Sequence, residues 1–360
     1  MLFDNLIPPH PVTPIAAIVE QAAPGLLKRP SAPATDAPIQ RLNPWARVGR
    51  AFEPTADARE AFIRSGLNWG VEKVGLRTDD LAPVPGAYAI RRTDTGRVLG
   101  TVGADYVTLS NEAAFGFFRD LGGDGRISFE TAGSFDHGSI VWVQARLPDL
   151  QIRIGDDISE TMLFISNGHI GNKTLTVAPT SFRICCKNSL RMAESEHAAD
   201  RRQRPGLEVG WTVRHTRGMT SALGDIQEAY ARTRRSHAVT VQAFEHLASK
   251  SITKRLKDTF LNRIFPATGP DESERASTIA QNRRERLEAI LAGSTSQVRG
   301  TKDSAFALLN AATEYIDFFR TTRVSEDGNE LEARLASATF GSGAGLKETA
   351  WVTILDLTKA

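Results

Sequence analysis

The spacing of apolar residues changes along the chain, from a period of two in the first half to about 3.6 in the second. Between residues 46 and 190, short runs rich in β-branched and aromatic residues are separated by Gly, Asp or Pro, which is typical of an antiparallel sheet. We expect a hairpin in which Asp94-Thr95-Gly96 forms the turn. The other expected strands lie at 69–76, 127–132, 139–147, 151–154, 161–166, 175–178 and 181–186.

Two short helices are predicted within this β-rich half. One covers 57–65 and ends at Gly66, and the other covers 111–121 with Asn111 as its N-cap. Asn188 is a natural N-cap for the point where the helical half begins.

A 3.6-residue period dominates the second half of the chain. An apolar stripe runs through Met219, Leu223, Ile226 and Tyr230, and Val241, Phe244 and Leu247 resume it. Further helices are expected at 252–265, 271–292, 303–322 and 345–357. The predicted fold class is therefore α+β, with an antiparallel β-rich N-terminal half and a helical C-terminal half. The predicted domains are an α+β core over 46–200 and a helical domain over 201–360.

Residues 1–45 hold about half of the 17 prolines. A segment of this composition builds neither a regular helix nor a sheet, so we expect a mobile Pro-rich arm.

The chain contains no run of about 18 to 20 apolar residues and no basic-then-apolar leader, so neither a membrane helix nor a secretory signal is expected. Its two cysteines, Cys185 and Cys186, are adjacent and poorly placed to bridge each other, which indicates a reducing, cytoplasmic setting. The net charge is +2, but residues 201–300 hold 18 Lys+Arg against 10 Asp+Glu. This surplus indicates either an anionic partner such as nucleic acid or a solvated helix surface rich in arginine.

Several segments, in their order and spacing, resemble the phage/plasmid-like protein family built on the domain of unknown function 932. The resemblance runs from about residue 44 to the end, and implies a gene carried on mobile elements without supplying a reaction. Ile170 departs from the family, in which an acidic residue follows the histidine. A similarity of fold to single-strand annealing proteins of the Rad52 type is also noted, because there too a β-meander precedes a basic helix. The segments include Gly66-Leu67-Asn68-Trp69, Phe129-Glu130-Thr131-Ala132-Gly133-Ser134, Ser166-Asn167-Gly168-His169, Arg263-Ile264-Phe265-Pro266 and Arg283-Arg284-Glu285-Arg286.

No recognisable catalytic arrangement stands in the sequence. There is no phosphate-binding Gly-rich loop with Lys-Ser/Thr and no Gly-x-Ser-x-Gly, and the seven histidines are scattered without metal-ligand spacing. We therefore expect no enzyme activity, no cofactor and no metal. An unrecognised site around His169 is the alternative, and we expect that side chain in a loop with no carboxylate oxygen within hydrogen-bond distance.

The predicted nucleic-acid-binding residues fall in two places. Asn167, His169, Asn172 and Lys173 form a polar loop between two apolar strands, which is either a recognition loop or a plain hairpin connection. Arg183, followed by Lys187, is either paired with a carboxylate such as Glu130 or exposed on the sheet for phosphate contact.

A third basic feature is helical, and no aromatic residues are interleaved with it that could stack on bases. It comprises Arg201, Arg202, Arg204, Arg214, Arg217, Arg232, Arg234, Arg235, Lys250, Lys254, Arg255 and Lys257. The resulting hypothesis is a non-enzymatic protein of mobile elements that binds single-stranded DNA in recombination or replication. The alternative is a structural or interaction protein that assembles into a homo-oligomer through its helices and binds no nucleic acid.

Overall fold

The computed structural model describes residues 44–55, 57–116, 127–185, 189–191, 211–217, 219, 226–266, 274–324 and 328–359. These residues belong to one compact unit, Gln40–Ala360. Of the arm predicted for 1–45, only Pro44 and Trp45 are described, at the start of helix α2 (Pro44–Val48). The domain boundary predicted at residue 200 and the helix cap predicted at Asn188 lie outside the described residues.

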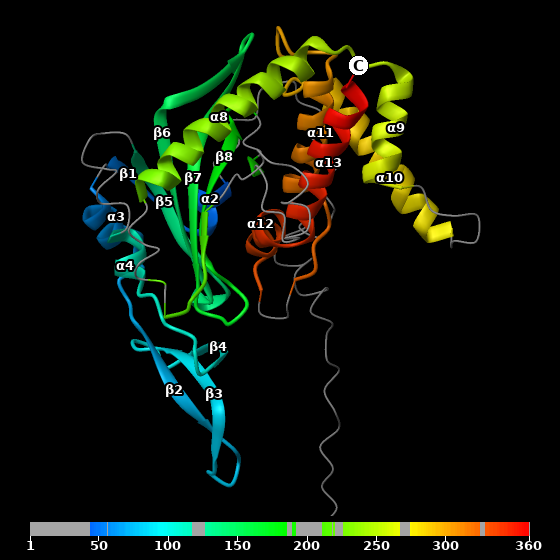
Figure 1. Cartoon of the computed structure of the whole chain (residues 1–360). Coiled ribbons are helices and arrows are strands. Elements are labelled where there is room, and N and C mark those ends of the chain that lie inside the picture. Colours follow the sequence, from blue (N-terminus) through cyan, green and yellow to red (C-terminus); the bar gives the residue numbers. More distant parts are fainter. Residues whose placement is uncertain are drawn as a thin grey trace, which may run out of the picture. The chain divides into compact units, whose positions relative to one another are not determined.

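A large antiparallel sheet forms the centre of this unit (Figure 1). Its strands follow the order β1-β5-β6-β7-β8-β10, and β9 pairs with β8 beside this path. The strands are β1 (Arg50–Thr55), β5 (Ser128–Phe135), β6 (Ile140–Ile154), β7 (Asp157–Gly168), β8 (Leu175–Arg183), β9 (Ser189–Arg191) and β10 (Trp211–Val213).

Both faces of this sheet are covered. Side chains that alternate along β6 go to opposite sides, so Val141 and Val143 pack in a cluster with helices α3 (Ala58–Ser65) and α4 (Asn111–Gly116). Trp142, between them, packs on the other side with residues of α2 and of α12 (Glu330–Phe340). Because neither face meets water, β7 and β8 are almost continuously buried rather than buried at every second residue.

Four of the predicted strands are in fact two long ones. The runs 139–147 and 151–154 belong to β6, where the register with β7 shifts between Arg146 and Gln151 around Pro148. A proline cannot donate a ladder hydrogen bond, so a bulge at this point lets the strand continue. The runs 175–178 and 181–186 likewise share β8, which ends at Arg183.

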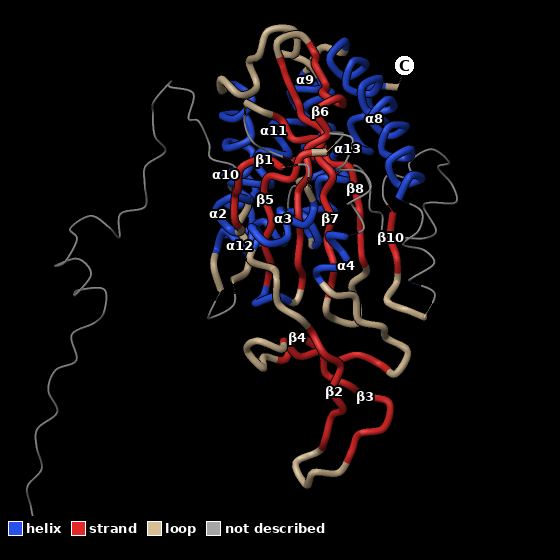
Figure 2. Tube along the Cα trace, turned by 90° about the vertical axis from the view of Figure 1, so that its left-hand side faces the viewer, coloured by secondary structure: helices blue, strands red, loops and turns tan. Residues whose placement is uncertain are grey.

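A separate three-stranded sheet contains β2 (Val71–Arg77), β3 (Pro83–Arg92) and β4 (Val98–Gly103), seen at the foot of Figure 2. The predicted hairpin is confirmed, with Gly96 at a φ of 70° in its turn. Ile90, Leu99 and Val102 form its small core, beside the partly buried Trp69 and Tyr106.

The C-terminal half is helical, as expected, so the α+β class is confirmed. Residues of β6 join a second large core with α8, α9, α10, α11 and α13. Helix α12 was not predicted, and α11 is buried on all sides from Ala305 to Asp317. The helices are α8 (Ile226–Ser249), α9 (Lys254–Ile264), α10 (Glu274–Ala292), α11 (Ala305–Phe318) and α13 (Ser342–Thr358).

The apolar stripe predicted on the first long helix packs inside the chain where it is described. Met219 lies in the sheet core, and Phe244 and Leu247 lie in the helical core. Leu223 and the side chains of Ile226 and Tyr230 lie outside the described residues.

Candidate functional site

The loop between β7 and β8 does not present its predicted recognition residues to solvent. Asn167 is 1% exposed and His169 is fully buried, so neither side chain can meet an external strand. Asn172 is exposed, and Lys173 is half-buried with its Nζ 5.6 Å from the centroid of the Phe340 ring. The side chains of Asn167 and His169 therefore make their contacts inside the fold rather than at its surface.

Three polar side chains form hydrogen bonds with the segment 107–111, one each at residues 107, 109 and 111. His215 Nδ1 lies 3.1 Å from the Val107 carbonyl oxygen, and Asn167 Nδ2 donates to the Leu109 carbonyl oxygen at 3.2 Å. His169 Nε2 lies 2.8 Å from Asn111 Oδ1. We call these three side chains, His215, Asn167 and His169, together with Asn111, the polar latch.

Asn111 was expected to cap helix α4, and this prediction is wrong. Ser110 takes that role, since its Oγ accepts the backbone N–H of Ala113 at 3.1 Å. The Asn111 amide instead turns inward and donates to the carbonyl oxygens of Leu67 and Trp69 at 3.0 and 3.3 Å. Asn111 thereby ties the chain leading into the three-stranded sheet to the end of β7.

The proton positions in the polar latch follow from these bonds. Because the Asn111 amide nitrogen is engaged, its oxygen faces His169, and Nε2 of His169 carries the proton. A carbonyl can only accept, so Nδ1 of His215 carries the proton there. The remaining buried atoms, His169 Nδ1, His215 Nε2 and Asn167 Oδ1, are acceptors with no hydrogen-bond partner in the described part of the chain.

Burial lowers the pKa of His169 to about 4, and the nearby charges of His215 and Arg92 act in the same direction. Burial also lowers the pKa of His215. His169 is therefore neutral at neutral pH. Among the described residues no carboxylate hydrogen-bonds to His169. The imidazole therefore lacks there the acidic partner that would orient it and stabilise its protonated form if it acted as a general base.

Aromatic contacts complete the polar latch. Tyr106 stacks on His215 with ring centroids 4.9 Å apart, and its hydroxyl donates to the Gly168 carbonyl oxygen at 2.8 Å. Trp69 meets His169 edge-on, and the Arg92 guanidinium carbon lies 3.9 Å from the Trp69 ring centroid. These contacts hold the three-stranded sheet against the end of the large sheet, which is a structural task.

Arg183 is also internal: the predicted pairing with a carboxylate is confirmed, although the partner is Asp157 rather than Glu130, and the predicted exposure on the sheet is wrong. Its side chain is 2% exposed, and its Nε lies 2.9 Å from both carboxylate oxygens of Asp157. Glu130, the expected partner, instead accepts from Arg146 Nε at 2.6 Å. A guanidinium so enclosed cannot contact a phosphate of an external strand.

The two predicted groups of residues lie far apart. Arg183 pairs with Ser159 near the start of β7, whereas His169 follows the end of that strand. Nine residues of extended chain separate these levels, or roughly 30 Å at about 3.3 Å per residue. Lys187 lies outside the described residues. The structure therefore does not bring the predicted residues into one site.

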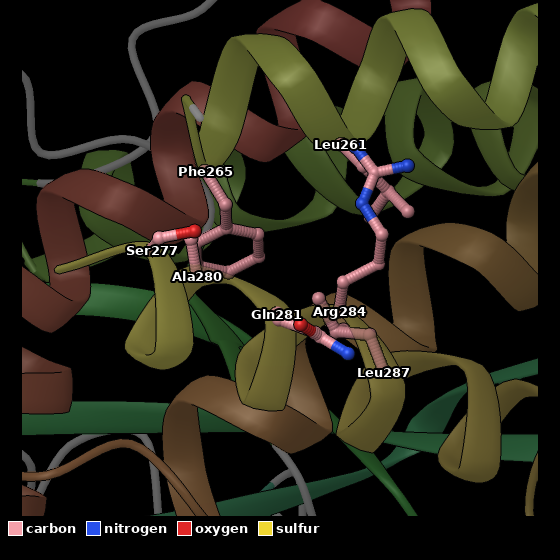
Figure 3. A pocket seen from close by; sticks show the side chains of 7 residues that line it. All are labelled: Leu261, Phe265, Ser277, Ala280, Gln281, Arg284 and Leu287. Carbon is pink, nitrogen blue, oxygen red and sulfur yellow. The ribbon is translucent and has the colours of Figure 1, made fainter. Parts of the chain in front are cut away.

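A cavity of about 290 Å³ lies between α9 and α10 (Figure 3). Its apolar lining consists of Leu261, Phe265, Ala280 and Leu287, with Ser277, Gln281 and Arg284 as polar members. Leu261 and Leu287 are buried because they also belong to the helical core, which fixes the cavity floor.

One arginine lines this cavity, and two others stand over aromatic rings of the helical half. Arg284 donates to Asn262 Oδ1 at 2.7 Å and to Asp258 Oδ1 at 3.3 Å, which fixes its guanidinium. The Arg283 guanidinium carbon lies 5.2 Å from the Phe265 ring centroid, and that of Arg286 lies 5.0 Å from Phe319. Neither Arg283 nor Arg286 has an acidic partner among the residues that the structure describes.

Sequence reasoning missed this arrangement because the aromatic ring and the arginines come from different helices. Phe265 and Arg283 are 18 positions apart, so no interleaved pattern marks them. The family resemblance already pointed to this region, because two of the segments that carry it are Arg263-Ile264-Phe265-Pro266 and Arg283-Arg284-Glu285-Arg286. The structure brings these two segments together.

The described residues contain no group of three or more His, Cys, Asp or Glu that could hold a metal ion. They also contain no helix that is both long and apolar enough to span a membrane.

The fold and site define an α+β protein whose antiparallel sheet is covered on both faces and whose helical half carries a largely apolar cavity bordered by Arg284. A family model described as Domain of unknown function (DUF932) matches residues 98–339, about two-thirds of the 360 residues, and the chain belongs to this family. No curated protein and no solved structure shows a significant match to the chain.

Proposed function

We propose that this protein is a non-enzymatic, single-stranded DNA-binding protein, and that the basic surface of α9 and α10 is its binding face. The observation that carries the proposal is Arg283, which stands over the half-buried Phe265 ring at the cavity and has no acidic partner among the described residues. A cation beside an aromatic ring is the combination that binds single strands without reading sequence.

The surrounding charge supports this assignment. Lys254, Arg255 and Arg263 are exposed on α9, and Arg286 is exposed on α10. Phosphates neutralised by such side chains release counterions, so the affinity should fall steeply as salt is raised. The residues first predicted for this role, Asn167, His169 and Arg183, are buried, and the binding face is therefore assigned to the helices instead.

The wider context belongs to the same proposal. The family resemblance supports a role on mobile genetic elements, in recombination or replication. The pair of adjacent cysteines supports a cytoplasmic location.

The test is the binding of a labelled single-stranded oligodeoxynucleotide, followed by fluorescence anisotropy over a range of salt concentrations. Replacing Arg283 and Arg286 together by Glu should raise the Kd by about tenfold or more and make the salt dependence shallower. Arg97→Glu, on the exposed hairpin of the three-stranded sheet, is the matched control and should change the Kd by less than about twofold. Absence of binding by the unaltered protein at low salt, or equal loss in both variants, would contradict the proposal.

A further inference from the structure

The cavity between α9 and α10 has an apolar interior and a polar edge, which together restrict what it can hold. Leu261, Phe265 and Leu287 supply the interior (Figure 3). The Phe265 ring is fixed in place, because Tyr315 meets it edge-on at a centroid distance of 5.4 Å and Arg283 stands 5.2 Å from its centroid. A rigid aromatic wall loses little conformational entropy when a ligand packs on it.

The polar edge offers both donors and an acceptor. Gln281 donates through Nε2 to Glu285 at 2.9 Å, which leaves its Oε1 without a donor among the described residues. The Ser277 hydroxyl likewise has no partner within the described part of the chain. The Arg284 guanidinium is held by Asp258 and Asn262 and borders the same space.

We infer that this cavity is a nucleobase subsite, which takes one unstacked base of the bound single strand against Phe265 with the edge of the base facing Gln281 and Arg284. This assignment rests on the proposed function. A flat heterocycle with donors and acceptors on its edge satisfies both parts of the lining. An aliphatic chain would leave the polar edge unpaired, and a lone phosphate would leave the apolar interior unfilled.

Arg283 connects the subsite to the strand. It lies beside the same ring and has no acidic partner among the described residues, so it is placed to meet the phosphate that follows an inserted base. The subsite thus supplies affinity through stacking, while the surrounding arginines supply the salt-dependent part.

The test compares two single strands of equal length and charge, one with bases and one whose central nucleotides are abasic. The unaltered protein should bind the strand with bases roughly tenfold more tightly, the usual scale of one base–aromatic stack. Phe265→Leu should abolish this preference while leaving the affinity for the abasic strand and the salt dependence unchanged. Gln281→Ala, an exposed position whose replacement leaves the core intact, should reduce the preference as well.

Phe319→Leu is the matched control, because Phe319 is also a half-buried ring of the helical core beneath an arginine but does not line the cavity. It should keep the preference for bases. Equal binding of both strands by the unaltered protein, or a preference that survives Phe265→Leu and Gln281→Ala, would overturn the subsite while leaving DNA binding in place. Binding of neither strand would remove the proposed function and the subsite with it.

A mononucleotide competitor distinguishes the two sources of a base. Thymidine monophosphate should compete only weakly, since it lacks the neighbouring phosphates. If it bound at least as tightly as the strand and lost affinity on Phe265→Leu, the cavity would belong to a free nucleotide and the strand assignment would be wrong.

Discussion

Arg183 and Asp157 form an ion pair in the interior of the protein, at the start of the β7–β8 pairing, with the arginine Nε 2.9 Å from both carboxylate oxygens. Thr301 reaches the same carboxylate from the helical half, at 3.3 Å between Oγ1 and Oδ2. The pair therefore connects one end of strands β7 and β8 to the segment that leads into α11. One position earlier, Asp156 makes a comparable ion pair with Arg299, but on the exposed surface.

These neighbouring aspartates give a matched pair of variants. Asp157→Ala should lower the free energy of unfolding by about 3 to 5 kcal/mol, because it leaves the Arg183 charge buried without its acid. Asp156→Ala should shift the urea midpoint far less, since its ion pair is exposed to water. Urea unfolding followed by circular dichroism measures both, and equal effects would contradict the distinction between the buried and exposed pairs.

The polar latch predicts a second stability difference. Asn111→Ala removes the partner of His169 Nε2 and two donors to backbone carbonyls, all inside the protein. Its cost should be about 2 to 3 kcal/mol, the scale for leaving buried polar groups unpaired. Asn172→Ala, at an exposed position of the β7–β8 loop, should stay within about 0.5 kcal/mol. A cost at Asn172 as large as that at Asn111 would show that the loop surface, rather than the latch, carries the stability.

The pKa of His169 makes stability depend on pH. Its pKa falls from an ordinary 6.5 to about 4 in the folded protein, so as the pH drops the unfolded state takes up this proton first. The free energy of unfolding should be unaffected by His169 above pH 6.5 and should fall between pH 6.5 and 4, by about 3 kcal/mol in total.

Urea unfolding at several pH values tests this dependence. In His169→Gln, the decrease in the free energy of unfolding between pH 6.5 and 4 should be smaller, because the contribution of His169 is removed. His137→Asn is the control, because His137 is exposed and Asn tolerates its positive φ of 56°. A slope unchanged in the His169 variant would show that another group is responsible.

A close approach of two glycines predicts a backbone effect. Gly155, in the turn between β6 and β7, and Gly300 both have positive φ, and a Cβ added to Gly300 would lie 2.7 Å from the Gly155 Cα. Gly300→Ala should therefore destabilise the protein by more than about 1 kcal/mol. Gly103→Ala, where an added Cβ meets nothing within 4 Å, should change the melting temperature little. A neutral Gly300→Ala would mean that the contact is easily relieved.

The alternating and 3.6-residue patterns located most elements because those patterns report local geometry. The helix over Ala58–Ser65, with Asp57 accepting from Arg59 and Glu60 and Gly66 at a φ of 72°, was readable from its own residues. Arg183 was not, because alternation assigns a side chain to a face but does not reveal that both faces are covered. Asn111 was misjudged because Ser110 beside it can cap as well. The cavity was missed because it exists only once α9 and α10 pack together.

Helix α11 has no side that meets water between Ala305 and Asp317, and even its charged Asp317 is enclosed, with Lys347 Nζ 2.8 Å away on α13. Its backbone amides can exchange with deuterium only when the surrounding helices separate, because no local fraying exposes them. The exchange rate of these amides therefore reports the global opening of the helical half. In a deuterium-exchange experiment, the amides of α11 would serve as the internal reference with which the exchange rates of the other segments are compared.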